Sequence, residues 1–206
     1  MEKAGTNGPL VTNRPRTAKD PQAVSLARSA NDTLRSSSSA PLVILGVDPG
    51  LRITGWGIVG VQDGALFSPA CGAIPTQAKQ PPEQRLHQIF KELCDVIARW
   101  KPAEVAVEEP FVGANVRSAF AVGEARAIAL LASAQAGLAA SGYAPTEVKL
   151  AVTGYGRSDK TQVQELVRVQ LGMVEAPKSE DASDALAVAL CHHMKRIEAA
   201  RLERAL

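Results

Sequence analysis

Aromatic residues and cysteine are scarce in this 206-residue sequence: Phe, Trp and Tyr together make up 4% of it, and cysteine occurs three times. The cysteines, at 71, 94 and 191, are too few for a disulfide framework and too widely spaced for a CxxC zinc site. We therefore expect reduced, buried thiols and a cytoplasmic location. No apolar run is long enough to cross a membrane, and 46% hydrophobic residues suffice for one ordinary folded core.

Charge of either sign is nearly balanced, because 23 Lys and Arg oppose 21 Asp and Glu. The positive excess lies in residues 1–40, which hold six basic and three acidic residues. That segment also contains three prolines, a run of four serines and almost no large apolar residues. It cannot bury enough surface to offset its ordering entropy. We predict a disordered, basic, Ser-rich extension over 1–40, which is a plain extension, a basic arm or a transit peptide, and a folded domain over 41–206.

Hydrophobic periodicity predicts a run of strands followed by strands that alternate with helices. The expected strands cover 42–47, 53–61, 65–74, 104–108 and 148–152. The expected helices cover about 82–101, 115–141 (closed by Gly142), 159–171 and a last segment from about 179. This order predicts an α/β fold with a mixed five-stranded sheet flanked by helices.

Acidic residues stand at the ends of two of the expected buried strands. Asp48 comes directly after strand 42–47, and Glu108 and Glu109 end strand 104–108. A carboxylate in such a place is unfavourable unless it faces a partner, a metal or a turn that donates hydrogen bonds. Because successive strand side chains point to opposite faces, at most one of Glu108 and Glu109 can join Asp48.

Two further acids, Asp181 and Asp184, open the last expected helix. Acids in a first helical turn are explained by the helix dipole when taken alone. Residues three apart, however, share one helix face, and the helix continues with the apolar run 185–190. We therefore expect its first turn to pack against the sheet and to direct both aspartates towards the strand ends.

Four carboxylates in one place need positive counter-charge, because like charges close together disfavour ionisation. The motifs that hold them contain no neutralising Lys or Arg, so we predict divalent cations. Oxygen-only ligands select Mg²⁺, or Mn²⁺ as a substitute, over zinc. Two such ions about 3.5–4 Å apart suit phosphodiester hydrolysis.

Several motifs follow one another along the chain: ILGVDPG at 44–50, TGWG at 54–57, AVEEPF at 106–111, single positions within 115–126, VTGYG at 152–156, DK at 159–160 and DASDALA at 181–187. This ordered set resembles the RuvC family of Holliday-junction resolvases over about residues 42–195. One Asp-x-Gly would be weak evidence, whereas the complete set in order is specific. Residues 1–40 lie outside the family pattern.

The resemblance implies an RNase H-like fold and a homodimeric endonuclease that cleaves symmetric strands of four-way DNA junctions in recombination and repair. It assigns the catalytic and metal-binding roles to Asp48, Glu108, Asp181 and Asp184, and leaves the place of Glu109 open. With two Mg²⁺ per active site, cleavage leaves 5′-phosphate and 3′-hydroxyl ends. The implied protein partner is a branch-migration complex of the RuvA and RuvB type.

Five residues are candidates for DNA binding. The resemblance matches Lys149 and Lys160 to lysines that bind the junction or support the transition state, and Phe111 to an aromatic that stacks on bases. The plain alternatives are a solvated strand-end lysine, a lysine at a helix start and a buried core phenylalanine. Arg117 and Arg126 are candidates for phosphate contacts, although arginines are common on helix surfaces.

The sequence Cys191-His192-His193 invites interpretation as a metal site. Adjacent histidines, however, face different sides of a helix, so we expect a fraying C-terminal turn that complements the helix dipole.

Three rival functions remain at this point. A nuclease of the same fold could cut RNA or linear DNA, an actin-like phosphotransferase shares the Asp-x-Gly turn, and a junction-binding protein could lack activity. The phosphotransferase needs a duplicated fold and a second phosphate loop, for which this chain has neither the length nor the motif. The complete carboxylate set argues against the inactive binder.

Overall fold

The computed structural model describes residues 40–110, 116–155 and 159–205. Residues 41–206 form one unit, and the extension predicted over 1–40 lies outside the described residues except for Ala40. No helix in the described part of the chain is long and apolar enough to cross a membrane.

A five-stranded mixed sheet forms the centre of the folded unit. Its strands are β1 (Leu42–Asp48), β2 (Ile53–Gln62), β3 (Ala65–Pro75), β4 (Glu104–Glu108) and β5 (Ala140–Tyr143). The order across the sheet is β3-β2-β1-β4-β5, with the first three strands in an antiparallel meander and β4 and β5 parallel to β1. The expected mixed sheet is confirmed.

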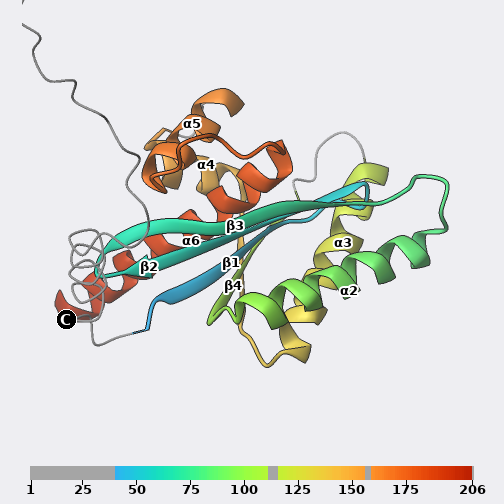
Figure 1. Ribbon diagram of the computed structural model, residues 1–206, viewed down its shortest axis with the longest axis horizontal. Helices are drawn as coiled ribbons and strands as arrows, with labels where there is room; N and C mark the ends of the chain where they lie inside the picture. The colour runs from blue at the N-terminus through green and yellow to red at the C-terminus, as the bar shows by residue number, and fades with distance from the viewer. Residues whose placement is uncertain (1–39, 111–115, 156–158, 206) are drawn as a thin grey trace, which may run out of the picture. The chain divides into compact units, whose positions relative to one another are not determined.

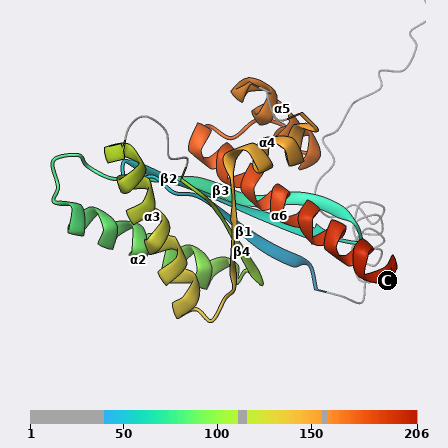
Figure 2. The same ribbon diagram turned by 180° about the vertical axis from the view of Figure 1, so that it is seen from behind.

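Helices cover both faces of the sheet (Figures 1 and 2). One face packs against α2 (Pro82–Trp100) and α3 (Val116–Gln135), and the other against α4 (Pro145–Thr153), α5 (Lys160–Gln170) and α6 (Glu180–Ala205). The alternation of strand side chains divides the core into two layers, with Leu45 facing α2 and α3 while Ile44 faces α6. The site described below lies on the α4–α6 side.

Helix α2 forms where its apolar stripe predicts it. Its buried residues Ile89, Leu93 and Ile97 recur every four positions on one face. Pro82 occupies the first turn, where a missing N–H costs nothing. Lys101 ends the helix in the left-handed conformation, with its N–H donated to the carbonyl of Ile97 at 2.8 Å.

Helix α6 lies directly on β1 and β2 because glycines line its path. A Cβ at Gly55 would collide with the carbonyl oxygen of Asp181, and one at Gly46 would collide with that of Ala185. Without these side chains the first turns of α6 approach the strand backbones closely. The expectation that this first turn packs against the sheet is therefore confirmed.

The expected fifth strand over 148–152 is wrong, because these residues lie in α4. Val148 and Val152 are the buried members of the segment, and a spacing of four is helical rather than the period of two of a strand. The edge strand is instead β5. The preceding long helix stops at Gln135, six residues before its predicted end, because Gly137 adopts the left-handed conformation (φ 71°) and redirects the chain.

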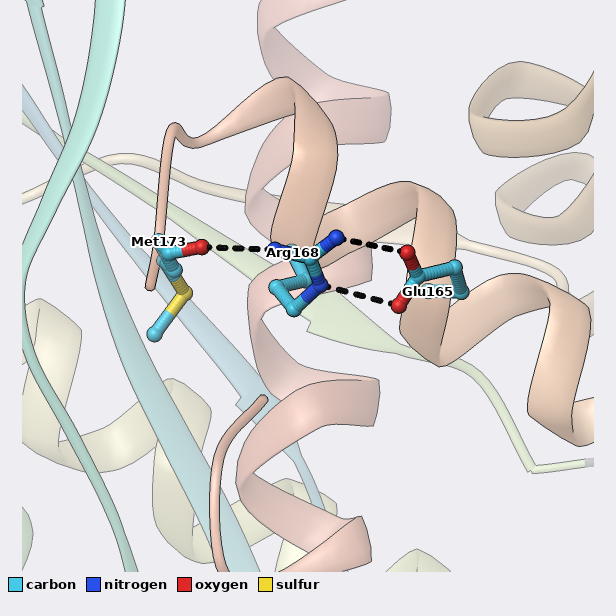
Figure 3. Close-up of polar contacts among 3 residues, drawn as sticks. All are labelled: Glu165, Arg168 and Met173. Atoms are coloured by element: carbon cyan, nitrogen blue, oxygen red, sulfur yellow. Dashed lines mark hydrogen bonds and ion pairs between the residues drawn. The ribbon is translucent and has the colours of Figure 1, made fainter. Parts of the chain in front are cut away.

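Arg168, near the end of α5, binds the chain that leads from α5 to α6 (Figure 3). The guanidinium of Arg168 binds both carboxylate oxygens of Glu165, at 2.9 and 2.7 Å, and donates to the carbonyl of Met173 at 3.0 Å. The N–H of Met173 in turn donates to the carbonyl of Arg168 at 2.9 Å. These bonds fix the turn from which the chain leads into α6.

The expectation of a fraying turn at Cys191-His192-His193 is wrong. All three residues are buried, and α6 continues to Ala205. His192 bonds to the hydroxyl of Tyr143 at 2.7 Å and to the carboxylate of Glu104 at 2.6 Å, which ties α6 to β5 and β4. The residues after 193 contribute little to the core, but they are good helix formers. Helix α6 therefore continues beyond the last buried residue, His193.

The cysteines are free, as expected. Cys191 is buried, while Cys71 and Cys94 are half-buried.

Candidate active site

A cavity of about 270 Å³ lies at the sheet edge where β1 and β4 end. The two strands are parallel, with Val47 beside Val107, so the residues that follow, Asp48 and Glu108, emerge at the same edge. The α4–α6 side closes the cavity. Its lining residues are Asp48, Glu108, Pro145, Lys149, Lys160, Val163 and Asp184.

Asp48 is the most perturbed aspartate of this site. Burial at the end of β1 raises its pKa to about 7, with further contributions from the negative charges of Asp184 and Asp181 and an opposing one from Lys160. The carboxyl group is therefore only partly ionised near neutral pH unless positive charge is brought to it.

Glu108 faces the same cavity from β4. Its pKa is raised to about 8, first by burial and then by the charges of Asp48 and Asp184, against the opposing effect of Lys149 and Lys160. Its neighbour Glu109 points to the other side, as strand geometry predicts. Glu108 is thus the member of the pair that joins Asp48.

Asp184 enters the cavity from the first turns of α6. Burial raises its pKa, while the ammonium of Lys160 opposes the rise. Asp181 does not line the cavity, although its charge acts on both Asp48 and Asp184. It accepts a hydrogen bond from the hydroxyl of Ser179 at 3.2 Å. The helix therefore brings one aspartate into the cavity and holds the second at its edge.

Lys160 supplies positive charge that the motifs alone did not reveal. Its ammonium lies 2.9 Å from Glu180 and 3.2 Å from Asp184, and these two carboxylates, Glu180 foremost, hold the pKa of Lys160 well above its usual range. The positive charge comes from α5, outside the motifs that hold the carboxylates. Sequence could not show the pairing, because α5 and α6 meet only in the folded chain.

Lys160 is also the first residue of α5, whose start is capped by Asp159. The carboxylate of Asp159 accepts from the N–H of Gln162 at 2.8 Å, and the side chain of Gln162 accepts from the N–H of Asp159 at 3.2 Å. This reciprocal cap confirms Asp159 as a helix start and holds the backbone from which Lys160 reaches the cavity.

Lys149 lines the cavity from α4 and lowers the pKa of Glu108. It is not a strand-end lysine, because the segment around it is helical. Two lysines therefore border three carboxylates. Their ammonium groups lie where the backbone of a nucleic acid would approach the acidic site.

The remaining candidates for DNA binding lie elsewhere or outside the described residues. Arg126, on α3, pairs with the carboxylate of Glu109 at 3.4 Å. Gly142 on β5 leaves room for this pair, since a Cβ there would collide with Glu109. Phe111 and the side chain of Arg117 lie outside the described residues.

The donors of the cavity suit a hard divalent cation. Oxygen is the only ligand type that the carboxylates offer, and burial, followed by the neighbouring negative charges, raises the pKa values of Asp48 and Glu108. In the part of the chain that the structure describes, no group of three or more His, Cys, Asp or Glu residues already has the arrangement of a metal site.

Comparison with known proteins identifies the family to which this arrangement belongs. The family model described as crossover junction endodeoxyribonuclease RuvC matches residues 44–192, from β1 to the buried part of α6. The chain belongs to the RuvC family. Its match includes every carboxylate and lysine of the cavity, and the family consists of metal-dependent nucleases.

Relatives within the RuvC family match almost their whole length. The crossover junction endodeoxyribonuclease RuvC of Heliobacterium modesticaldum is 50% identical over 150 residues, which cover 73% of this chain and 93% of the relative. The Thermus thermophilus RuvC structure has a TM-score of 0.71 at 33% identity and covers 76% of this chain and 96% of its own. T. thermophilus RuvC in complex with Holliday junction substrate has a TM-score of 0.71 at 34% identity, with coverages of 75% and 94%.

These comparisons confirm the RNase H-like α/β fold and an enzyme of the crossover junction endodeoxyribonuclease class.

Proposed function

We propose that this protein resolves four-way DNA junctions by metal-dependent hydrolysis at the cavity between β1, β4 and α6. The observation that carries the proposal is the convergence of Asp48, Glu108 and Asp184 with Lys149 and Lys160 at one sheet edge. It is supported by the likeness to T. thermophilus RuvC, which has been solved with a Holliday junction substrate.

The carboxylates hold the cations in this proposal. Asp48 would serve both ions, Glu108 would hold one of them, and Asp181 with Asp184 would hold the other. When bound, two Mg²⁺, or Mn²⁺ in their place, make water nucleophilic and stabilise charge on the phosphate oxygens. The products are 5′-phosphate and 3′-hydroxyl ends.

The lysines bind the DNA backbone in this proposal. Lys149 is exposed and can meet a phosphate at the cavity mouth. Lys160 pairs with Asp184 and Glu180 in the free protein, and it turns to a phosphate oxygen when cations neutralise these acids. Stacking by Phe111 and phosphate contacts by Arg117 are proposed from the resemblance alone, whereas Arg126 serves Glu109.

The direct test compares substrates. A synthetic four-way junction, a linear duplex of the same sequence and an RNA duplex are each incubated with the protein in Mg²⁺, in Mn²⁺ and in EDTA. We expect nicks at symmetric positions of the junction, dependent on the divalent ion, with 5′-phosphate ends by labelling. Equal cleavage of the linear duplex or of RNA would favour the rival nuclease, and binding without any cleavage would favour the inactive binder.

We further propose a homodimer through the exposed face of α3. Phe120 is 70% exposed and Leu131 is 54% exposed, and with Glu124, Ala127 and Ala134 they form an exposed row on this helix. The spacing of four, three, four and three residues is the seam of a helix pair. Two-fold symmetry across this row gives the two active sites that paired nicking requires.

Charged residues in this row should separate the protomers. For Phe120→Asp with Leu131→Asp, we expect the dimer dissociation constant to rise about hundredfold, since uncompensated charge in an interface costs about 3 kcal/mol. Sedimentation velocity measures this, with Val174→Asp as the control because Val174 is 93% exposed in a loop away from α3. In the double variant, the fraction of junctions nicked on both strands should fall as the dimer dissociates. A double variant that stays dimeric refutes this interface.

A branch-migration partner of the RuvA and RuvB type and a cytoplasmic location stay predictions from the sequence.

A further inference from the structure

The backbone turn that follows Asp48 is clamped from outside by α2 and by the end of β3. Arg85, on the first turns of α2, donates from its guanidinium to the carbonyl of Leu51 at 2.9 Å and to the hydroxyl of Thr76 at 2.9 Å. The hydroxyl of Thr76 donates to the same carbonyl at 2.5 Å. Thr76 is buried and Arg85 is half-buried, so these bonds are partly shielded from water.

The neighbouring carbonyls of the turn are bound as well. The carbonyl of Arg52 accepts from the N–H of Thr76 at 2.9 Å, and the carbonyl of Gly50 accepts from the buried hydroxyl of Thr54 at 2.8 Å. Three successive carbonyls therefore have partners, although the turn itself belongs to no strand. Such backbone groups must be satisfied when they are partly buried.

The place of this turn makes the clamp relevant to the site. Asp48 is the last residue of β1. Asp48 and Gly55 form the last pair of the β1–β2 ladder before the turn that joins these strands. Beyond this pair β1 has no further ladder partner, so the direction in which the backbone leaves Asp48 is set by the turn over 49–52. Catalytic groups have to be held within about 0.5 Å of their productive geometry by such support.

We propose that Arg85 and Thr76 are positioning residues for Asp48, which clamp the turn over 49–52 and thereby hold its carboxylate where a catalytic cation is bound. The inference rests on the proposed function of Asp48 as a cation ligand. Neither residue touches the cavity: the lining residues do not include them, and they act only through the backbone that follows Asp48.

Arg85→Met and Thr76→Val test the clamp, each removing hydrogen bonds while keeping approximate side-chain volume. Gln88→Ala is the matched control, because Gln88 lies one turn further along α2 and donates to the carbonyl of Pro75 at 3.1 Å, without reaching the turn over 49–52. Thr76→Ser keeps the hydroxyl and should retain the Mn²⁺ affinity that Thr76→Val loses. Melting temperature shows which variants are folded, and Thr76→Val serves if Arg85→Met is not.

The decisive readout is Mn²⁺ affinity measured by calorimetry on the protein without DNA. We expect the dissociation constant to rise at least fivefold in Arg85→Met and Thr76→Val, and to stay within twofold in Gln88→Ala and Thr76→Ser. Cleavage should follow, with kcat down about tenfold and the KM for the junction within twofold. Clamp variants that bind Mn²⁺ and cleave like Gln88→Ala overturn the inference.

Asp48→Asn separates this outcome from failure of the proposed function. If Asp48→Asn loses Mn²⁺ binding and cleavage while the clamp variants keep both, only the clamp is wrong. If Asp48→Asn keeps both, the cation site itself is wrong and the clamp falls with it.

Discussion

Asp48→Asn is expected to lower the rate of junction cleavage about a thousandfold while the protein still folds and binds the junction. The change removes one negative charge and keeps the size of the side chain. A lost cation ligand removes several kcal/mol of charge stabilisation from the transition state, and each 1.36 kcal/mol is a factor of ten in rate. Folding should not suffer, because burial and neighbouring charges already disfavour the ionised form of Asp48.

The measurement is single-turnover cleavage of a labelled four-way junction in saturating Mg²⁺. Asp63→Asn is the control, because it makes the same chemical change in the β2–β3 turn, where position 63 has a positive φ that Asn tolerates. We expect wild-type rates for the control. Wild-type nicking by Asp48→Asn would show that the chemistry takes place elsewhere or without this carboxylate.

Stability without metal is expected to fall as the pH rises from about 4 to about 8. Asp48 and Glu108 have pKa values raised by burial to about 7 and about 8, so the folded protein keeps protons that the unfolded chain has released. Stability therefore falls with pH in this window. It is fully present below the ordinary pKa values near 4 and is lost as the pH passes the folded-state values.

The comparison of wild type with the double variant Asp48→Asn, Glu108→Gln isolates this effect. His193 acts in the opposite sense, since burial lowers its pKa, but it is present in both proteins and cancels. We expect equal melting temperatures near pH 4 and a wild type about 5 °C less stable at pH 8, on the scale of a few °C per kcal/mol for a chain of this size.

Mg²⁺ should reverse the loss in the wild type at pH 8, more strongly than at pH 5, because protons and cations compete for the same oxygens. It should have little effect on the double variant. A wild type that gains stability relative to the variant between pH 5 and pH 8 in the absence of metal would contradict the buried carboxylate site.

The candidate site was largely readable from local sequence. Each carboxylate stands next to a signal of its own: Asp48 and Glu108 follow short apolar runs, and Asp184 opens an apolar helix. Parallel strands that end at one sheet edge bring the first two together, so the site follows from element order once the elements are recognised.

Two elements were misread because burial, rather than local propensity, distinguishes them. The segment 148–152 is apolar enough for a strand, yet Val148 and Val152 face the core while Lys149 and Leu150 are exposed. Only the helices packed against α4 decide which residues are buried. Helix α6 likewise continues to Ala205, although its last buried residue is His193. Its last turns are helical because their residues are good helix formers.

The sequence by itself determined the strands β1 to β4, the strand-end acids and the choice of Glu108 or Glu109 as a single partner for Asp48, because these depend on the period of two along a strand. Tertiary structure alone decided that Glu108 is that partner, that Lys160 pairs with Asp184, and that Arg85 reaches across 34 positions to the turn after Asp48. Such contacts join elements distant in sequence, and their geometry arises only when helices pack on the sheet.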